Sequence, residues 1–378
     1  MTDNTASASA PAPHHSVSFA EAFRLWLKIG LLSFGGPAGQ IAMMHRMLVD
    51  EKRWISEDRF LHALNYCMLL PGPEAQQLAT YLGWLLHRTL GGIVAGTLFV
   101  LPGFIVIVGL SILYAVYQEI TLVQAMFFGI KAAVLAVVVE AVMRIGKRAL
   151  KNSVMKILAA LAFIAIFFFD VPFPIIVLAA ALVGLMGGRL WPDKFVVIKG
   201  QQPKAGATPV IDALLTGDNR PEHTRPSTAR ALKVAVIWLA VWFAPLIALA
   251  LMQGVSDVFL KEGLFFSKMA VVTFGGAYAV LAYVAQQAVA TYGWLAPGEM
   301  MDGLGLAETT PGPLIMVLAF VGFLAAFRAP GGLDPVWAGV LGATLTTWVT
   351  FAPCFLWIFL GAPYIESVRN NKALSAAL

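Results

Sequence analysis

SFGGP at residues 33–37 recurs as TFGGA at residues 273–277, and PGP at residues 71–73 recurs at residues 311–313. Both pairs are separated by the same offset of 240 residues. Identical residues at this offset continue between and beyond the motifs: Ala42 and Ala282, Trp54 and Trp294, Leu64 and Leu304, Leu78 and Leu318, Ala79 and Ala319, and Arg88 and Arg328. One offset that holds over this distance is hard to reach by chance, so the chain contains an internal duplication.

The motifs shared by the two copies consist of glycine and proline inside otherwise apolar sequence. Both residue types interrupt helices. In secondary transporters, interrupted hydrophobic segments at corresponding places of two repeats are the best sequence indication of the substrate site. The duplication therefore predicts a transporter whose site lies where the two copies meet.

The composition is that of a membrane protein. Of 378 residues, 59% are hydrophobic and 12% are charged, and the mean hydropathy is +0.78. Soluble domains carry about 45–50% apolar and about 25% charged residues. We therefore predict an all-α polytopic membrane protein, which crosses the lipid bilayer several times.

Other classes of protein find little support in the sequence. The formal net charge of +5 could indicate nucleic acid, but Lys and Arg cluster in a few loops, which membrane topology explains better. The two cysteines, Cys67 and Cys354, are too few and too far apart for a metal site or a disulfide framework. Because no hydrolase, metalloprotease or P-loop motif occurs, we expect no catalytic residues, no cofactor and no ATP-driven pump.

Six stretches are long and apolar enough to cross a bilayer, at about 20 residues each. They are residues 91–116, 121–147, 151–170, 173–190, 231–253 and 333–361. The sequence predicts four parts: a disordered N-terminal tail at 1–16, a first repeat domain at 17–190, a cytoplasmic linker at 191–230 and a second repeat domain at 231–378.

The basic loops predict the orientation of the repeats. Loop 144–156 and the linker are rich in Lys and Arg, which indicates the cytoplasm. Loop 45–59 carries four basic residues and belongs on the same side, which requires the interrupted segments to be re-entrant hairpins. The equivalent loop 291–302 has no Lys or Arg and is expected outside. Since an odd number of spans separates the copies, we predict inverted-topology repeats, with both termini cytoplasmic.

The interrupted segments also predict an anion site. A helix that begins inside the membrane presents unpaired N–H groups and about half a positive charge. Pro37, Pro73 and Pro313 stand where a first helical turn would start, and the neighbouring glycines let backbone approach a ligand closely. Inverted copies would bring four such half-helix N-termini together at the bilayer midplane, where they could hold an anion without lysine.

The candidate anion-binding residues are the motifs and the uncharged polar residues near them. They are Ser33, Gly35, Gly36, Gln40, Pro71, Gly72, Pro73, Gln76, Gln77, Thr273, Gly275, Gly276, Thr309, Thr310, Pro311, Gly312 and Pro313. The alternative is purely structural: Gly and Pro would kink packed helices or let them approach, and the polar side chains would bond between helices.

Ionisable residues inside apolar sequence are candidates for proton coupling. They are Glu74, Glu308, Glu140 and Lys131. Glu74 directly follows the first Pro-Gly-Pro motif, within one turn of the expected anion. Alternatively, Glu74 is only a first-turn carboxylate at a helix N-terminus, and Lys131 and Glu140 only pair with other helices.

Four segments carry a resemblance to a known family: LLSFGGPAGQIAMMH (31–45), LLPGPEAQQLATYLGWLLHRTLGGIVAGTLFVLPGF (69–104), TFGGAYAVLAYV (273–284) and LAETTPGPLIMVLAFVGF (306–323). They are similar to the chromate ion transporter (CHR) family, and the similarity covers about residues 20–116 and 257–361. Length and duplication fit the long, two-domain members. The resemblance implies an inner (cytoplasmic) membrane protein that expels chromate by exchange with protons, as an antiporter, and so confers chromate resistance.

The family's motif positions correspond to residues in both copies of this chain. They are Gly35, Gly36, Pro71, Gly72, Pro73, Gly275, Gly276, Pro311, Gly312 and Pro313. The second copy departs from the first with Ala277 in place of Pro37 and Leu314 in place of Glu74. A role that needs two equal copies is therefore in doubt.

Other substrates and mechanisms stay open at this point. Sulfate is a tetrahedral dianion of nearly the same size as chromate, so uptake or exchange of sulfate or another oxyanion is the closest rival. An anion channel is less expected, because a pore built from oligomeric symmetry would show a pore-lining ring. Transport direction, coupling ion and oligomeric state, a homodimer included, are left open by the sequence.

Overall fold

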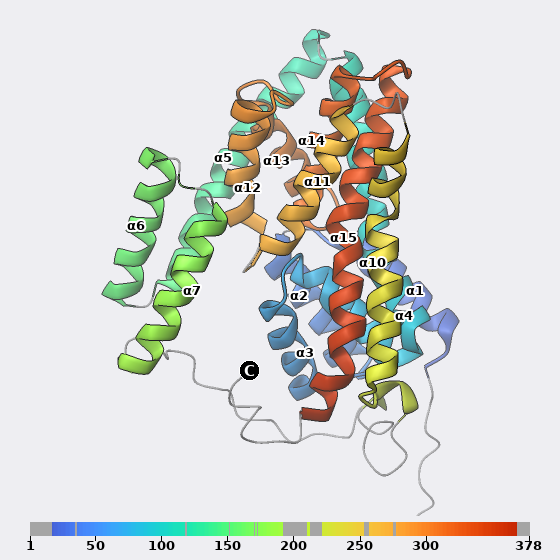
Figure 1. Ribbon diagram of the computed structural model, residues 1–378. Helices are drawn as coiled ribbons and strands as arrows, with labels where there is room; N and C mark the ends of the chain where they lie inside the picture. Colours follow the sequence, from blue (N-terminus) through green and yellow to red (C-terminus); the bar gives the residue numbers. More distant parts are fainter. Residues whose placement is uncertain are drawn as a thin grey trace, which may run out of the picture.

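A computed structural model describes residues 17–368 of the chain, without residues 35, 118, 151, 170, 172, 192–209, 212–220, 253–256 and 275–276 (Figure 1). The described residues form helices and connecting turns and contain no strand, which confirms the all-α prediction. Gly35, Gly275, Gly276, the expected tail at 1–16 and most of the expected linker lie outside the described residues.

The first copy folds as short helices that flank the predicted breaks. The elements are α1 (Phe19–Leu32), α2 (Gly36–His45), the π-helical turn η1 (Arg46–Glu51), α3 (Glu57–Leu69) and α4 (Glu74–Tyr117). The FGG motif therefore separates α1 from α2, and the Pro-Gly-Pro motif separates α3 from α4. Ser18 and Ser56 start α1 and α3 as N-caps, since each hydroxyl accepts a hydrogen bond from the third residue on.

The second copy repeats this order of elements. It contains α11 (Asp257–Val272), α12 (Ala277–Gln286), the π-helical turn η3 (Gln287–Thr291), α13 (Glu299–Thr309), the 3₁₀ turn η4 (Leu314–Met316), α14 (Val317–Arg328) and α15 (Pro335–Val368). The left-handed backbone at Gly72 (φ 110°) also recurs at Gly312 (φ 104°). The internal duplication in the sequence is thus also a structural duplication, which extends to the conformation of individual turns.

Helix α4 is two helices joined at a sharp bend. His87 and Arg88 have non-helical dihedral angles, with φ −135° and 55°. In the second copy the chain breaks at the same place, because α14 ends at Arg328 and α15 begins at Pro335. The short half before each break follows the Pro-Gly-Pro motif, and the long half after it corresponds to a predicted span.

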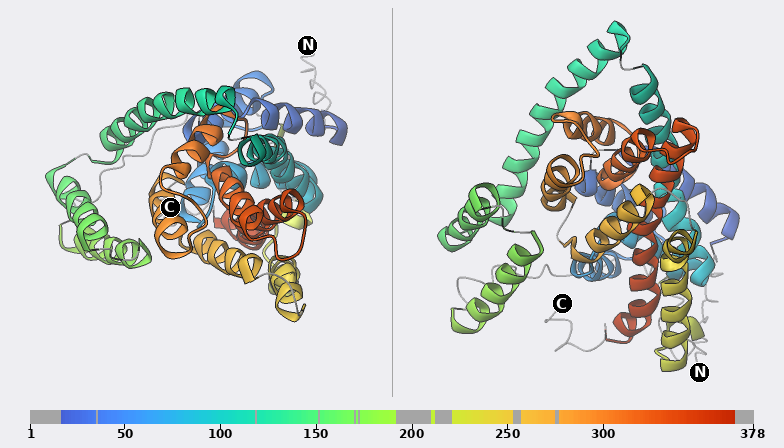
Figure 2. Two further views of the ribbon diagram at one scale, coloured as in Figure 1. Left: turned by 90° about the horizontal axis from the view of Figure 1, so that it is seen from above. Right: turned by 45° about the horizontal axis from the view of Figure 1, so that its top comes forward.

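The remaining predicted spans are also helical. They form α5 (Thr121–Ala149), α6 (Ser153–Phe169), α7 (Phe173–Leu190) and α10 (Thr228–Leu251), the last preceded by the 3₁₀ turn η2 (Glu222–Thr224). Within the described part, α4, α10 and α15 are long and apolar enough to cross a membrane. Helices α6 and α7 stand apart from the other helices in both views of Figure 2, and α6 buries none of its side chains.

The long helices are exchanged between the cores of the two copies. One core cluster contains α1–α3 and the first half of α4, and it is completed by Phe355, Ile358 and Phe359 of α15. The other surrounds α11–α14 and is completed by Ile107 and Tyr114 of α4. The two copies are therefore interlocked, and the motifs of both lie between the two cores.

Candidate functional site

The duplicated motifs contact one another through two equivalent backbone hydrogen bonds. The N–H of Gly72 donates to the carbonyl of Thr273 at 2.8 Å, and the N–H of Gly312 donates to the carbonyl of Ser33 at 2.9 Å. Each bond joins a Pro-Gly-Pro turn of one copy to the FGG break of the other. The offset of 240 residues converts one bond into the other, as a two-fold relation between the copies would require.

Gln40 ties the same breaks together with its side chain. Its Nε2 donates to the carbonyls of Ser33, at 3.1 Å, and Gly312, at 2.6 Å. The side chain is fully buried, and its Oε1 has no hydrogen-bond partner among the described residues. The sequence suggested Gln40 as a donor to an anion. Because both N–H bonds are directed at backbone carbonyls, the structure makes it a residue that positions the breaks.

A small pocket lies between these breaks. The lining residues are Pro37, Gln40, Pro73, Glu74, Ala75, Thr273, Pro313, Leu314 and Ile315. They come from the N-terminal ends of α2, α4 and η4 and from the C-terminal end of α11. Three of the four expected helix N-termini therefore meet at one place. The fourth, at the start of α12, follows Gly275 and Gly276, which are outside the described residues.

The pocket is small in this conformation. Its volume is about 10 Å³, which is room for about one water molecule. A tetrahedral oxyanion needs more space, so its walls must move apart before such an ion can enter.

The two copies contribute unequal walls to this pocket. The first supplies the amide of Gln40 and the carboxylate of Glu74, whereas the second supplies Thr273 and the apolar Pro313, Leu314 and Ile315. At the offset of 240 residues, Leu314 corresponds to Glu74 and Val280 corresponds to Gln40. The departure of the second copy therefore falls within the pocket.

The prolines stand close to their expected places. Pro37 is the second residue of α2, whereas Pro73 and Pro313 immediately precede α4 and η4, one position earlier than a first helical turn. Gly36 begins α2 with φ 70°, a conformation that favours glycine.

Other expected site residues lie around the pocket without lining it. Gln77 Nε2 donates to the carbonyl of Pro71 at 2.7 Å and so holds the first Pro-Gly-Pro turn. Gln76 Nε2 donates to Thr80 Oγ1 at 3.3 Å. Thr309 is exposed, and its hydroxyl donates to the carbonyl of Gly305. The hydroxyls of Ser33 and Thr310 are buried and have no partner in the described part of the chain.

The ionisable candidates differ in their relation to the pocket. Glu74 lines the pocket. Glu308 is half-buried on α13 and is not part of the pocket wall, and Glu140 is exposed on α5. The side chain of Lys131 lies outside the described residues. Among the three candidates whose side chains the structure describes, the geometry therefore associates Glu74 alone with the pocket.

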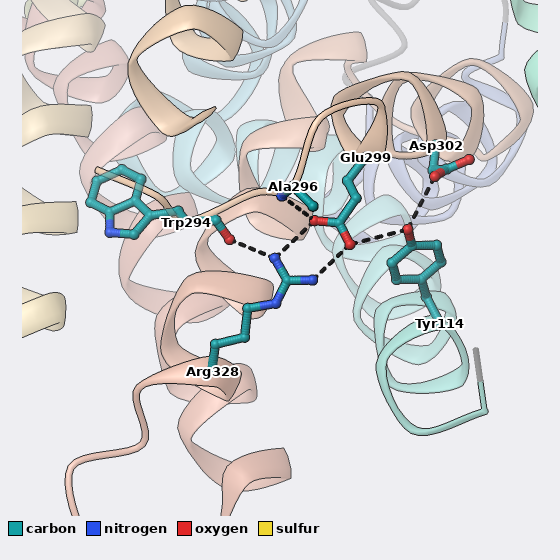
Figure 3. Close-up of polar contacts among 6 residues, drawn as sticks. All are labelled: Tyr114, Trp294, Ala296, Glu299, Asp302 and Arg328. Atoms are coloured by element: carbon teal, nitrogen blue, oxygen red, sulfur yellow. Dashed lines mark hydrogen bonds and ion pairs between the residues drawn. The ribbon is translucent and has the colours of Figure 1, made fainter. Parts of the chain in front are cut away.

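Two charged clusters, one buried and one partly exposed, flank this central region and were not indicated by the sequence. In the first, Arg59 of α3 donates to Glu366 of α15 at 2.5 Å, and the hydroxyl of Tyr81 donates to the same carboxylate at 2.6 Å. In the second, Arg328 makes a bidentate ion pair with Glu299 of α13, at 2.6 and 2.8 Å (Figure 3). Tyr114 of α4 reaches Glu299 at 3.3 Å and Asp302 at 3.0 Å.

The clusters occupy equivalent places in the two copies. Arg59 and Glu299 are related by the offset of 240 residues and carry opposite charges. Glu366 lies at the end of α15, and Arg328 lies just before its start, so the clusters are separated by about the length of that helix, roughly 45 Å. The sequence held one signal of these clusters: the same position of the repeat is a basic residue, Arg59, in the first copy and an acidic residue, Glu299, in the second.

Comparison with known proteins gives a consistent result. The chain matches the family model described as chromate transporter over residues 20–185 and 260–378. It is 35% identical over 382 aligned positions to a chromate transport protein of Pseudomonas aeruginosa, covering 100% of this chain and 80% of that protein.

Two further relatives carry similar names. The chain is 28% identical to a chromate transport protein of Cupriavidus metallidurans, covering 93% of this chain and 76% of that protein. It is 27% identical to a probable chromate transport protein of Synechococcus elongatus, covering 96% of this chain and 80% of that protein. No solved structure matches.

Proposed function

Because the chain belongs to the chromate transporter family, we propose that it is a secondary active transporter that expels chromate in exchange for protons. Such efflux would confer chromate resistance. The observation that carries the proposal is the pocket where the helix-breaking motifs of both copies meet.

The pocket has the chemistry of a weak anion site. The helices α2 and α4 both begin at its wall, and the first N–H groups of a helix have no partner within it. The positive end of each helix dipole favours an anion there. Backbone groups of this kind bind an oxyanion without a buried lysine, whose charge would be costly when the pocket is empty.

Glu74 makes occupancy of this pocket sensitive to protons. An ionised carboxylate beside a dianion in a poorly hydrated pocket repels it strongly. Anion binding should therefore favour a protonated Glu74, which by itself would bind anion and proton together. Since the family resemblance implies exchange, we assign Glu74 a role in tuning anion affinity and look elsewhere for the exchanged proton.

We also propose that the repeats are inverted in an inner (cytoplasmic) membrane, with both termini cytoplasmic. The reciprocal hydrogen bonds of Gly72 and Gly312 and the exchanged long helices support a two-fold relation between the copies. The basic loop 45–59 and the neutral loop 291–302 support opposite sides for them. The proposed parts remain a domain at 17–190, a linker at 191–230 and a domain at 231–378.

The small volume of the pocket favours alternating access over a channel. A conducting channel needs a continuous path, whereas this pocket holds about one water molecule. Opening towards one side at a time would let the same site load and release the anion. The charged clusters at the two ends of α15 are suited to hold either side shut.

The test is transport by the purified protein in lipid vesicles. We expect a pH gradient to drive chromate across the membrane against its own gradient, and chromate movement to carry protons the opposite way. A sulfate flux that exceeds the chromate flux at equal concentration would instead make sulfate the substrate. Chromate movement that never exceeds equilibration would indicate a channel.

A further inference from the structure

Glu262 is a buried carboxyl that the anion pocket does not use. It lies on α11, and its side chain has no exposed surface. Neither carboxylate oxygen has a hydrogen-bond partner among the described residues. Because burial of an unpaired charge is very costly, carboxyls inside membrane proteins are uncommon and mark functional sites by default.

The surroundings of Glu262 on its own helix are apolar. The residues one turn away on the same face are Val258, Phe259, Phe265 and Phe266, and all four are buried. A side-chain carbon on the neighbouring Gly263 would meet Leu246 of α10 at 2.1 Å, and Leu345 of α15 also lies within contact distance. This part of α11 therefore sits in a tightly packed apolar interface with α10 and α15.

Ionisable groups on the elements packed against α11 are engaged or lie at its surface. Arg328 of α14 is paired with Glu299, Glu366 of α15 is paired with Arg59, and Arg230 of α10 donates to a backbone carbonyl at His223. The remaining ionisable groups on these elements are Lys233 on α10, Cys354 and Tyr364 on α15, Tyr283 and Tyr292 around Phe265, and Lys261 and Lys268 on α11 itself. None of them makes a hydrogen bond with the Glu262 carboxylate.

The duplication shows that packing alone does not require this carboxyl. At the offset of 240 residues, Glu262 corresponds to Ala22 of α1, which is also buried. The following turn in α1 is apolar as well, with Leu25 and Trp26 in place of Phe265 and Phe266. A buried methyl group at this helix position is thus compatible with the packing of the first copy. Packing therefore does not explain why the second copy has an ionisable side chain there.

Glu262 and the pocket lie on one helix. Helix α11 ends at Val272, and Thr273 lines the pocket. Thr273 follows Glu262 by eleven positions, which corresponds to roughly 16 Å along a helix. This distance excludes direct contact with a bound anion, yet any movement of α11 changes both places.

We propose that Glu262 binds the proton that is exchanged for chromate, at a site separate from the anion pocket. This inference rests on the proposed exchange function. In this conformation the carboxyl holds its proton, because the side chain is fully buried and no described residue stabilises the carboxylate. Movement of α11 against α10 and α15 would admit water, to which the O–H bond gives up its proton, and a proton from the opposite side restores it.

Coupling then follows from the difference between conformations. A carboxyl that is buried in one state and hydrated in another binds its proton with different free energy in each, so protons bias the conformational equilibrium. The anion biases the same equilibrium through the wall formed by Thr273. Binding of the anion and binding of the proton are thus coupled through the movement of α11.

The experiment compares Glu262→Gln with the wild-type protein in lipid vesicles. We expect the variant to lose pH-driven chromate transport by at least about tenfold, with no accompanying proton flux, since a carboxamide of the same shape cannot carry a proton. Exchange of labelled for unlabelled chromate without a pH gradient should remain within about twofold, because the anion pocket is untouched. Glu21→Gln, which removes an exposed carboxylate of α1, is the matched control and should behave as wild type.

A second measurement uses the wild-type protein and does not depend on folding of a variant. A hydrophobic carbodiimide reacts with protonated carboxyls in apolar surroundings, so it should modify Glu262, as read by mass spectrometry, and stop proton-coupled transport. An unmodified Glu262, or a Glu262→Gln variant with unchanged proton flux, overturns the inference and leaves the exchange function intact. Wild-type chromate flux that ignores the pH gradient would instead refute the exchange function itself.

Discussion

Arg59 and Glu299 stand at the same position of the duplicated segment and make ion pairs of opposite polarity. Arg59 of α3 binds Glu366 at the end of α15, and Glu299 of α13 binds Arg328, with Tyr114 of α4 on the same carboxylate. Arg59 joins α3 of the first copy to α15 of the second by an ion pair, whereas Glu299 pairs with Arg328 inside the second copy and is joined to α4 of the first copy by the hydroxyl of Tyr114. The interlocked helices are therefore linked at one end by an ion pair and at the other by a hydrogen bond to a paired carboxylate, whereas their middles pack through apolar side chains.

Removing Glu366 should destabilise the protein strongly. Both partners of the Arg59–Glu366 pair are at most 7% exposed, and loss of one partner from a buried pair costs about 3–5 kcal/mol. We expect Glu366→Gln to lower the unfolding temperature in detergent. Lys52→Gln, which breaks the exposed pair with Glu21, is the control and should cost about 0–1 kcal/mol. Equal losses in both variants would contradict a stabilising role for the buried pair.

Gly312→Ala should abolish transport without preventing membrane insertion. Gly312 has φ 104°, and an added side-chain carbon would lie 3.0 Å from the Cα of Gly103 in α4. An alanine at this position would therefore strain the backbone of the turn and press against the backbone of α4, both beside the pocket. Gly109→Ala on α4, whose added carbon meets nothing within 4 Å, is the matched control. Vesicle transport at the wild-type rate by Gly312→Ala would show that the turn tolerates change.

Gly36→Val should have a similar effect at the other motif. Gly36 begins α2 with φ 70°, which a β-branched residue strongly resists. We expect chromate transport to be lost while the protein still inserts, as measured in vesicles and by membrane fractionation. If Gly36→Val transported normally, the motif would serve packing and the anion site would lie elsewhere.

Glu74→Gln should strengthen chromate binding at neutral and alkaline pH. Glu74 lines the pocket, and loss of its negative charge removes repulsion of the dianion. Binding measured by calorimetry should become less dependent on pH than in the wild type. A variant with unchanged affinity and unchanged pH profile would separate Glu74 from the anion.

The proposed inversion can be tested by labelling from one side of the membrane. Lys52 and Thr291 are exposed in equivalent loops of the two copies, whereas Cys67 and Cys354 are buried. With both native cysteines replaced, a cysteine at 291 should react with an impermeant thiol reagent added outside, and a cysteine at 52 should not. Thr291 is preferred to Gly293, whose φ of 62° disfavours a side chain. Labelling of both positions from one side would rule out inverted repeats.

Acid should destabilise the region around η2 through His223. Burial, together with the charges of Arg88 and Arg230, lowers the pKa of His223 from 6.5 to about 4. The unfolded chain therefore binds a proton at higher pH than the folded protein, so stability falls as pH decreases from 6.5 towards 4. His223→Phe should reduce this dependence in unfolding measurements at several pH values. An identical pH dependence in the variant would assign acid sensitivity to other groups.

The sequence was most informative where the two copies agree. The helix breaks at FGG and Pro-Gly-Pro and the helical structure of all six predicted stretches followed from Gly and Pro positions and hydropathy, because these signals are local. The meeting of Gly72 with Thr273 could be expected only from the duplication, since nothing local links residues so distant in sequence.

Other parts of the site depend on side-chain placement that sequence patterns do not encode. The amide of Gln40 is used by two backbone carbonyls, and Thr309 points to the surface, although both are polar residues beside a motif. The sequence does not single out Glu262, because its segment contains Asp257, Lys261 and Lys268 and resembles a half-exposed helix. Its complete burial depends on how α10 and α15 cover it.

The exchange of long helices between the cores also determines when the protein can finish folding. The core around α1–α3 is closed by Phe355, Ile358 and Phe359, which leave the ribosome long after α1–α3 have been synthesised. Until α15 is inserted, the apolar faces of the first copy must be covered by lipid or by the insertion machinery. The first half of the chain is thus an incompletely packed intermediate during biogenesis. A substitution that impairs α15 would destabilise the packing of α1–α3, at the opposite end of the polypeptide.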